Sequence, residues 1–378
     1  MKVLQVYRTY FPDTQGGLQE TIRQIALNTK PLGVESRIFT PSPDPSPPVI
    51  ESHEGEIHRV NLDFEIASCG FSFSGMGRFS ELMDWADIVH YHFPWPFADC
   101  LYFVDRMRHK GHRQKKSLLT YHSDIVRQQM LAFLYAPLMN QFLDSVDRII
   151  CTSDHYLHSS VNLLARQDKT SVIPIGLNES SYPTRDEVLT EKLRLQYGED
   201  FFLFVGVLRY YKGLHIVLEA MQGAPFNLVI AGQGPYRKHL ERQALQLKLN
   251  NVHFAGHVPD PEKVALYHLC RGVVLPSHLR SEAFGVTLVE GSMYGKPLVS
   301  VEAGSGTSFV NNDGKTGLVV PPENPGALRQ AMDQIYEDRE RAEEMGECAR
   351  ERYETLFSGE AMGKAYYKVY QKLLEDQA

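Results

Sequence analysis

The feature that most constrains the fold is a regular alternation of short apolar segments with longer segments of helical period. Buried parallel strands read as near-continuous apolar runs because helices cover both faces of their sheet. The pattern therefore predicts an α/β fold built on doubly wound parallel sheets. The expected strands are 3–7, 36–40, 86–92, 116–122, 147–153 and 170–176 in the first half, and 201–207, 226–232, 251–256, 271–277, 297–302 and 316–322 in the second.

The series of strands is interrupted once. After IPIGLN at 173–178 the sequence becomes polar and aperiodic, and a new first strand begins at Phe201. A chain of 378 residues has room for two domains, at roughly 150 residues for each, or for three small ones. We predict an N-terminal domain over residues 1–178 and a C-terminal domain over 179–355, two Rossmann-like halves that face each other across a ligand-binding cleft. The last segment, 356–378, has the period of an amphipathic helix.

Composition narrows the classes of partner and compartment. Lys plus Arg number 39 and Asp plus Glu number 46, so the net charge is −7. This balance disfavours a nucleic acid partner, because neutralising phosphates requires an excess of basic residues. Five scattered cysteines without a C-x-x-C pair favour a reducing compartment. The N-terminus has no signal-peptide pattern and no run of ~18 apolar residues occurs, so we expect a cytoplasmic protein whose membrane contact is peripheral at most.

The most specific chemical signal is SEAFGVTLVE at 281–290. Glu282 and Glu290 lie eight residues apart, and a helix is expected to begin near Val286 and to end at Gly295. The two carboxylates would accept hydrogen bonds from ligand hydroxyls at different depths. The free N–H groups of the helix start, exposed by Gly285, would bind oxygens of a sugar or a phosphate. The alternative is that both glutamates are solvated charges at the ends of a helix.

Two further segments are suited to phosphate. FVGVLRYYKG at 204–213 supplies Arg209 and Lys212 at a strand end, where cations neutralise the charge that grows on a departing diphosphate. Gly16 and Gly17 follow the first strand and would let a phosphate approach the backbone. The alternatives are a surface charge for Arg209 and an ordinary tight turn for the glycine pair.

Histidines mark strand ends in the first half. TYHSDIV places His122 where its ring could bind a sugar hydroxyl, with Asp124 and Arg127 near enough to orient it or to meet a second substrate. The alternative is that His122 is a capping or buried histidine. His90 and His92 lie two residues apart on one strand and therefore share a face. They could form a metal pair, but no third ligand is evident in the sequence, so we expect them to line a substrate site or to pack. The chain also contains no D-x-D motif, a pair of carboxylates that could hold a divalent cation, so the sequence favours a site that works without a metal ion.

Together these motifs closely resemble the family-four retaining glycosyltransferases. The resemblance covers nearly the whole chain, through YFPDTQGG, TYHSDIV, VGVLRYYKG, AGQGP, FAGHV, PSHLRSEAFGVTLVE, GKPLVS and GKTGLVVPP, and it includes an E-x7-E signature. Within that group, YHSDIVRQ, LRYYKG and GTSFVNNDGKTGLVVPP are similar to bacterial enzymes that add mannose or rhamnose to surface polysaccharides such as O-antigen. The resemblance implies the GT-B fold, with the C-terminal helix packing back on the first domain.

The resemblance also implies roles for the matched residues. Glu282 would face the donor sugar near its C3 hydroxyl, Glu290 would hold the ribose hydroxyls, and His122 would contact the sugar near its reactive carbon. The other expected donor-binding residues are Gly16, Gly17, Phe284, Gly285, Val286, His257 and Val258, and the expected acceptor-side residues are His92, Asp124 and Arg127.

One departure from the family pattern concerns the diphosphate. The family places an arginine directly after the first glycine of VGVLRYYKG, where this chain has Val207. Arg209, two residues later, would point the same way in an extended backbone, and Lys212 matches directly. We expect both cations to serve catalysis and donor binding.

The predicted function is retaining, metal-independent and cofactor-free transfer of a hexose, mannose or D-rhamnose, from a nucleotide diphosphate sugar. We expect a GDP-sugar as donor and a glycan or undecaprenyl-type lipid-linked acceptor in surface polysaccharide synthesis. The alternatives are a sugar-nucleotide epimerase on the same scaffold and a non-catalytic sugar-nucleotide- or glycan-binding subunit. The basic run at 106–116 is either a solvated helix end or a patch that contacts the anionic inner membrane leaflet.

Overall fold

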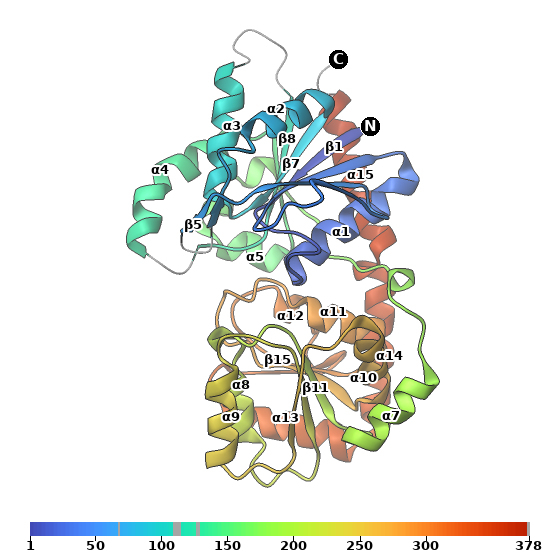
Figure 1. The fold of residues 1–378 in the computed structure, drawn as a ribbon. Helices are drawn as coiled ribbons and strands as arrows, with labels where there is room; N and C mark the ends of the chain where they lie inside the picture. The colour runs from blue at the N-terminus through green and yellow to red at the C-terminus, as the bar shows by residue number, and fades with distance from the viewer. Residues whose placement is uncertain (67–68, 109–114, 126–128, 376–378) are drawn as a thin grey trace. The chain divides into compact units, whose positions relative to one another are not determined.

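The computed structural model describes residues 1–66, 69–108, 115–125 and 129–375 (Figure 1). The chain divides into two compact units, of which the first comprises Met1–Ile175 with Gly359–Ala378 and the second Gly176–Ser358. The predicted boundary followed residue 178, and the observed one follows residue 175. Each unit is a mainly parallel sheet with helices packed on its faces.

The first unit contains an eight-stranded sheet in the order β10-β9-β8-β7-β1-β2-β4-β3. All neighbours run parallel except β3 and β4. A separate antiparallel pair consists of β5 and β6. The strands are β1 (Lys2–Val6), β2 (Glu35–Ser42), β3 (Val49–Glu51), β4 (Glu56–Asn61), β5 (Phe64–Ile66), β6 (Cys69–Phe71), β7 (Ile88–Phe93), β8 (Lys116–Tyr121), β9 (Arg148–Cys151) and β10 (Thr170–Val172).

The second unit contains a six-stranded parallel sheet in the order β13-β12-β11-β14-β15-β16. The strand order reverses between β11 and β14, which is where ligands bind in doubly wound sheets, at the carboxyl ends of the strands. The strands are β11 (Phe202–Val205), β12 (Leu228–Ala231), β13 (Val252–Gly256), β14 (Gly272–Leu275), β15 (Leu298–Val301) and β16 (Gly317–Val320).

Helices connect the strands of both sheets. In the first unit they are α1 (Gly17–Thr29), α2 (Met76–Trp85), α3 (Pro96–Arg108), α4 (Gln129–Ser145), α5 (Asp154–Ser159), α6 (Val161–Leu164) and α15 (Gly359–Glu375). In the second unit they are α7 (Glu187–Tyr197), α8 (Leu214–Ala220), α9 (Arg237–Gln246), α10 (Asp260–Leu269), α11 (Val286–Met293), α12 (Thr307–Val310), α13 (Pro325–Glu337) and α14 (Arg339–Arg352).

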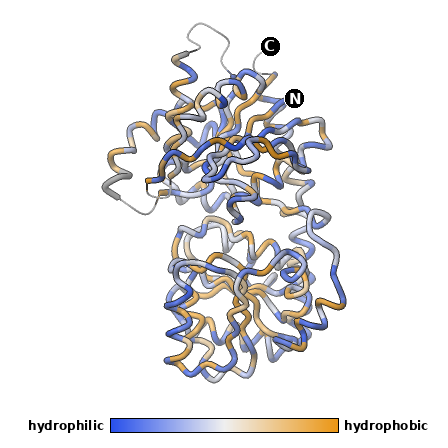
Figure 2. Tube along the Cα trace, viewed as in Figure 1, coloured by the Kyte–Doolittle hydropathy of each residue, from blue (hydrophilic) through white to orange (hydrophobic). Residues whose placement is uncertain are grey.

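The observed sheets confirm the predicted fold class. Each of the twelve predicted apolar segments overlaps one strand of a sheet, and these strands form the hydrophobic centre of each unit in Figure 2. The pattern missed β3, β4, β5 and β6. Three of these strands are only three residues long, and β4, EIHRVN, interleaves charged residues with apolar ones. Short or mixed segments lack the continuous apolar run that marks a buried parallel strand.

The C-terminal helix α15 packs on the sheet of the first unit, as the fold class predicted. Its buried residues recur every three or four positions and join one core cluster with residues of β1, β7, β8 and α1. This stripe consists of Met362, Tyr366, Tyr370 and Leu373. The first unit is therefore completed by a segment that follows the second unit in sequence.

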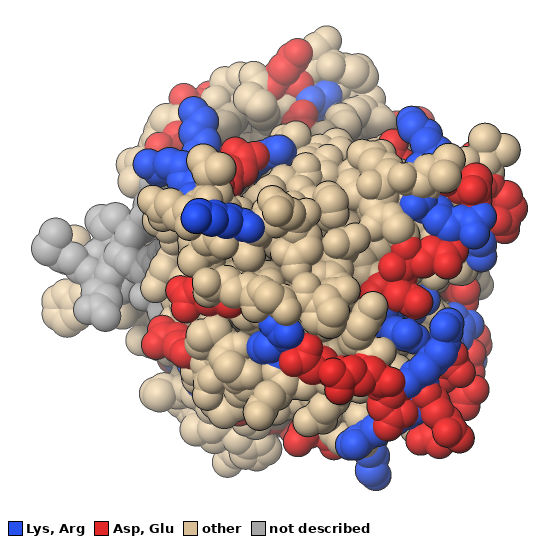
Figure 3. Space-filling model, turned by 90° about the horizontal axis from the view of Figure 1, so that it is seen from below, with Lys and Arg blue, Asp and Glu red and all other residues tan. Residues whose placement is uncertain are grey.

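The surface carries charges of both signs. On the face drawn in Figure 3, Lys and Arg lie beside Asp and Glu, and exposed helices carry ion pairs such as Arg339–Glu343 at 3.0 Å. Among the described residues, no helix combines the length and the apolarity needed to cross a bilayer.

Candidate functional site

The second unit brings Lys212 to Glu282. Lys212 lies in the turn that follows β11, and Glu282 lies in the loop after β14, the two strands between which the order reverses. The Lys212 Nζ to Glu282 Oε2 distance is 2.5 Å, and both side chains are 11% exposed. Ser277 Oγ donates a second hydrogen bond to the same oxygen at 3.2 Å. Burial lowers the pKa of Lys212, but the charge and hydrogen bond of Glu282 together with Tyr211 raise it above its ordinary value, so the ammonium group stays charged.

Local backbone geometry makes this approach possible. Gly213, directly after Lys212, has a φ of 70°, and a Cβ atom there would lie 1.9 Å from the carbonyl oxygen of Pro276. Only glycine allows this turn to pack so closely against the loop after β14. Arg209 starts the same turn in extended backbone (φ −124°, ψ 156°) with an exposed side chain, and its charge acts to lower the pKa of Lys212. Two cations therefore share one strand end.

The helix expected in SEAFGVTLVE is α11, which begins at Val286 and carries Glu290. Its N-cap, Gly285, has a φ of 89° and a ψ of 61°, the left-handed region that favours glycine. Leu288 N already donates to the Gly285 carbonyl at 2.8 Å, so the N–H groups of Val286 and Thr287 are the ones that can meet a ligand oxygen at the helix start. Phe284 buries its side chain against Phe309 and Phe357, so only its backbone remains for a ligand.

Three residues that the sequence analysis did not identify surround the Glu290 carboxylate. Tyr182 OH and Lys263 Nζ each donate to Oε1 at 3.0 Å, and Tyr267 OH donates to Oε2 at 2.8 Å. Lys263 is also 3.0 Å from Asp260. Burial lowers the pKa of Lys263, but Glu290 and Asp260 outweigh burial and raise it. The signal that could have identified Lys263 is its position on the helix that follows FAGHV.

The FAGHV segment begins in β13 and continues into the loop before α10. His257 is exposed in this loop and Val258 is partly buried. Both residues precede the helix whose Lys263 contacts Glu290. The loop that carries His257 and Val258 therefore leads directly into the helix whose Lys263 holds the Glu290 carboxylate.

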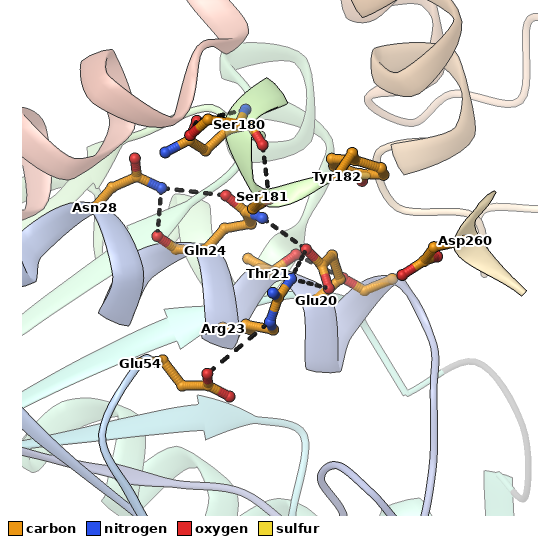
Figure 4. Close-up of polar contacts among 12 residues, drawn as sticks. Glu20, Thr21, Arg23, Gln24, Asn28, Glu54, Ser180, Ser181, Tyr182 and Asp260 are labelled. Carbon is orange, nitrogen blue, oxygen red and sulfur yellow. Dashed lines mark hydrogen bonds and ion pairs between the residues drawn. The ribbon is translucent and has the colours of Figure 1, made fainter. Parts of the chain in front are cut away.

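In the first unit, Gly16 and Gly17 lie at the start of α1. Gly16 has a φ of −179°, an extended conformation that any residue adopts. Figure 4 shows the acidic residue of the first turn, Glu20, engaged by its helix neighbours. Arg23 Nη1 donates to Glu20 Oε1 at 3.1 Å and Gln24 Nε2 donates to the same oxygen at 2.7 Å. The charge of Arg23 offsets that of the Glu20 carboxylate. An anionic ligand at the N-terminus of α1 would therefore be repelled less by Glu20.

His122 follows β8 and is 6% exposed. Its Nε2 is 3.0 Å from Nδ1 of His92 on β7, and Nε2 of His92 is 2.8 Å from Gln5 Oε1 on β1. Burial lowers the pKa of His122 to about 3 and lowers that of His92 well below its usual value, so both rings are neutral at pH 7. His92, expected on the acceptor side, uses both ring nitrogens within the protein.

His90 lies on the same face of β7 as His92. Its Nδ1 is 2.9 Å from Tyr370 OH and its Nε2 is 2.7 Å from Thr120 Oγ1. Both of its ring nitrogens are therefore also engaged within the protein. Among the described residues, no group of three or more His, Cys, Asp or Glu side chains is arranged to hold a metal ion.

Asp124 is held by hydroxyl groups of its own unit. Its Oδ1 accepts from Tyr121 OH at 2.8 Å and from Ser160 Oγ at 2.7 Å, and its Oδ2 accepts from Tyr156 OH at 3.1 Å. The ring of His122 bonds to His92 instead. Arg127 lies outside the described residues, and so do 109–114 of the basic run.

The two units thus carry groups of different chemistry. The second unit supplies two cations and two carboxylates around strand ends, which suits a ligand with a diphosphate and several hydroxyls. The first unit supplies a neutral imidazole at the end of a strand, which suits a hydroxyl.

The family comparisons match both halves of the chain. Residues 15–181 match the model of Glycosyltransferase Family 4, and residues 186–352 match that of Glycosyl transferases group 1. D-rhamnosyltransferase WbpZ of Pseudomonas aeruginosa is 49% identical over 95% of this chain and 92% of its own length. O-antigen chain mannosyltransferase C of Escherichia coli is 44% identical over the full length of both chains.

A solved structure supports the fold. Sucrose-phosphate synthase from Thermosynechococcus elongatus matches 99% of both chains with a TM-score of 0.82 at 23% identity. These comparisons confirm the predicted family: the chain belongs to the family-four glycosyltransferases of the GT-B fold and is a transferase enzyme.

Proposed function

We propose that this enzyme transfers mannose or D-rhamnose, with retention of configuration, from a GDP-sugar to a growing surface polysaccharide of the O-antigen type. The observation that carries the proposal is the Lys212–Glu282 pair at the strand-order reversal of the second sheet. The choice of sugar rests on the two relatives, one a D-rhamnosyltransferase and the other an O-antigen chain mannosyltransferase.

In this proposal the second unit binds the donor. Lys212 and Arg209 neutralise the diphosphate, and their charge stabilises it most when it departs. Glu282 Oε2 accepts from Lys212 and Ser277, whereas Oε1 has no partner among the described residues and accepts from a sugar hydroxyl. Glu290, held by its own cation and hydroxyls, accepts from the ribose.

The proposed step needs no protein nucleophile. The bond between the sugar C1 and the diphosphate oxygen breaks, and its electron pair stays on that oxygen. The acceptor hydroxyl oxygen bonds to C1 on the same face, and its proton passes to the departing phosphate. A neutral His122 adds no positive charge beside the oxocarbenium-like carbon, and no metal ion is required.

The test combines donor binding with product analysis. Thermal shifts are measured with GDP-mannose, GDP-D-rhamnose, UDP-glucose and ADP-glucose in the presence of EDTA, because a ligand that binds the native state raises the melting temperature. We expect a GDP-sugar to give the largest shift and to yield an α-linked product with a synthetic acceptor. A β-linked product, or no transfer from any donor, would refute the proposal.

The same assay separates transfer from epimerisation. An epimerase converts its sugar nucleotide without an acceptor, so incubation with donor alone would produce a new sugar nucleotide. The relatives named above are transferases, which favours transfer. A product from the isolated chain would also exclude a non-catalytic subunit. Loss of activity on EDTA treatment, restored by a divalent cation, would contradict a metal-independent mechanism.

We further propose a lipid-linked acceptor, reached through the basic run 106–116 at an anionic membrane. Support comes from α4, where Phe133 and Leu134 are 79% and 72% exposed. Exposed apolar side chains favour insertion at a membrane interface, and a basic segment favours an anionic lipid surface. We expect the protein to float with vesicles containing phosphatidylglycerol, and F133S/L134S to float less. Equal flotation with neutral vesicles would argue against an electrostatic contact.

A further inference from the structure

A continuous series of buried hydrogen bonds runs through the first unit from α15 to His122. The side chains of this series, in order, are Tyr366, Thr120, His90, Tyr370, Gln5, His92 and His122. All seven are buried, and the donor–acceptor distances run from 2.7 Å to 3.4 Å. We refer to these seven residues as the histidine series.

The two-residue period of the strands explains why these side chains meet. Along β7, Ile88 begins a face that continues through His90 and His92, and along β8 the same face runs from Leu118 through Thr120 to His122. The apolar residues at the strand starts contact the apolar stripe of α15. The polar residues lie toward the carboxyl ends of the strands, where two tyrosines of α15 supply hydroxyl groups.

The chemistry of Gln5 determines where the protons lie. With the Gln5 amide oriented so that Nε2 faces Tyr370, Oε1 faces His92 and can only accept, so His92 carries its proton on Nε2, which lies 2.8 Å away. Because a neutral imidazole has one donor and one acceptor nitrogen, Nδ1 of His92 is then an acceptor. Nε2 of His122, 3.0 Å from that acceptor, must therefore carry the proton. Nδ1 of His122 is left as an acceptor without a hydrogen-bond partner among the described residues.

We propose that Gln5, His92 and Tyr370 are positioning residues that hold His122 as its Nε2–H tautomer, so that Nδ1 accepts a hydrogen bond from a hydroxyl of the transferred sugar. This inference rests on the proposed function through His122 and adds residues to which no role in the reaction has been assigned. The depressed pKa values of His92 and His122 are consistent with neutral rings, on which the assignment depends.

Tyr370 contributes by engaging the other end of the Gln5 amide. Gln5 Nε2 donates to Tyr370 OH at 3.4 Å, and Tyr370 OH lies 2.9 Å from Nδ1 of His90. If the amide were rotated by 180°, the donors and acceptors of the series would reverse. His122 would then present an N–H donor at Nδ1. The ring nitrogen of His122 that carries the proton therefore depends on the orientation of the Gln5 side-chain amide on β1.

The test begins with the proton positions of the wild-type protein. Histidine labelled with ¹⁵N distinguishes protonated from unprotonated ring nitrogens by chemical shift, and the His122 signals are assigned by their loss in H122N. We expect the proton of His122 on Nε2 at pH 7. A proton on Nδ1 would overturn the proposal.

Matched variants then test positioning. H92L removes the acceptor of the His122 proton, whereas H92N keeps one because the Asn Oδ1 replaces Nδ1. We expect H92L to lower kcat about tenfold, the loss of one hydrogen bond in the transition state, while KM for the donor changes little. H92N should recover most of the activity and the Nε2–H signal. A fully active H92L, or equal losses in both variants, would overturn the positioning role.

A tyrosine pair supplies a second comparison that preserves volume. Y370F removes the hydroxyl bonded to Gln5 and should give mixed tautomers of His122 with reduced kcat. Y91F removes a buried hydroxyl that has no hydrogen-bond partner in the described part of the chain, on the same strand as His92, and should match the wild type in both readouts. An unchanged tautomer and kcat in Y370F would remove Tyr370 from the proposal.

The proposed function can fail separately from this inference. If H122N transfers sugar at the normal rate, His122 has no role in the reaction, and the positioning proposal falls with it. If H122N is inactive but wild-type His122 is protonated on Nδ1, the proposed function stands and only the inference is wrong.

Discussion

Lys212 and Glu282 lie 70 positions apart in the chain, yet their side chains form an ion pair of 2.5 Å in the second unit. Each is nearly buried, so each depends on the other for its charge to be tolerated. The pair keeps a cation and a carboxylate in place before any ligand arrives. Preformed charges of this kind avoid the cost of reorganisation when charge develops in a reaction.

The ion pair predicts a stability effect as well as an activity effect. Lys212→Met leaves the Glu282 carboxylate nearly buried without its cation, which should cost about 3 kcal/mol of unfolding free energy. The double variant K212M/E282Q should be more stable than K212M, because neither charge remains unpaired. Urea unfolding followed by circular dichroism measures both, and neither variant should transfer sugar. K238M, at an exposed lysine of α9, is the control. Equal stability of the single and double variants would show that the pair is not coupled.

The cluster around Glu290 predicts a binding effect. Lys263→Met removes the cation that holds Glu290 Oε1, so affinity for GDP should fall about tenfold, or roughly 1.4 kcal/mol, with a smaller change in kcat. Tyr267→Phe removes a buried hydrogen bond to Oε2 and should cost roughly 1–2 kcal/mol of stability. Isothermal titration calorimetry with GDP tests the first effect against K238M. If K263M binds GDP normally, Glu290 does not serve the nucleotide.

Backbone conformation at the start of α11 predicts a glycine requirement. Gly285→Ala places a side chain at a φ of 89°, which costs roughly 1–2 kcal/mol, and its Cβ would lie 3.0 Å from Leu275 Cδ2. Gly314→Ala is the matched control, because Gly314 has a φ of 72° and open space around its Cβ position. We expect G285A to lose more stability than G314A and to lose transfer activity, which G314A keeps. Similar thermal unfolding of the two variants would show that packing at Gly285 is unimportant.

Burial of His92 predicts acid sensitivity with a definite sign. His90, His122 and Tyr7 are the titratable groups packed against its ring. Burial lowers the pKa of His92 in the folded protein, whereas the unfolded chain titrates near pH 6.5. Below that pH the unfolded state binds one more proton at His92 than the folded state does, so His92 by itself lowers the unfolding free energy by about 1.4 kcal/mol per pH unit as the solution is acidified.

The H92N variant isolates this contribution. Urea unfolding between pH 7 and pH 5 should show a shallower loss of stability in H92N than in the wild type, by up to one proton. H239N, at an exposed histidine, should retain the wild-type slope. The same slope in all three proteins would mean that folded His92 takes up its proton in this range.

Local patterns predicted the twelve apolar strands, the start of α11 at Val286 and the amphipathic α15. Each of these features depends on residues close together in sequence, because a buried strand or helix stripe is set by its own period. The same reasoning placed Glu282, Lys212 and His122 at strand ends. Strands β3 to β6 escaped prediction because they are short or mix charged with apolar residues.

The sequence by itself therefore determined the family, the doubly wound sheets and the residues that stand at their carboxyl ends. Only the tertiary structure decided which of these residues touch. Strand order brings Lys212 to Glu282, α10 brings Lys263 to Glu290, and α15 covers the face that carries His90 and His92. A period of two shows that two histidines share a face, but not whether another segment covers it. That depends on contacts between residues far apart in the chain, which no local pattern records.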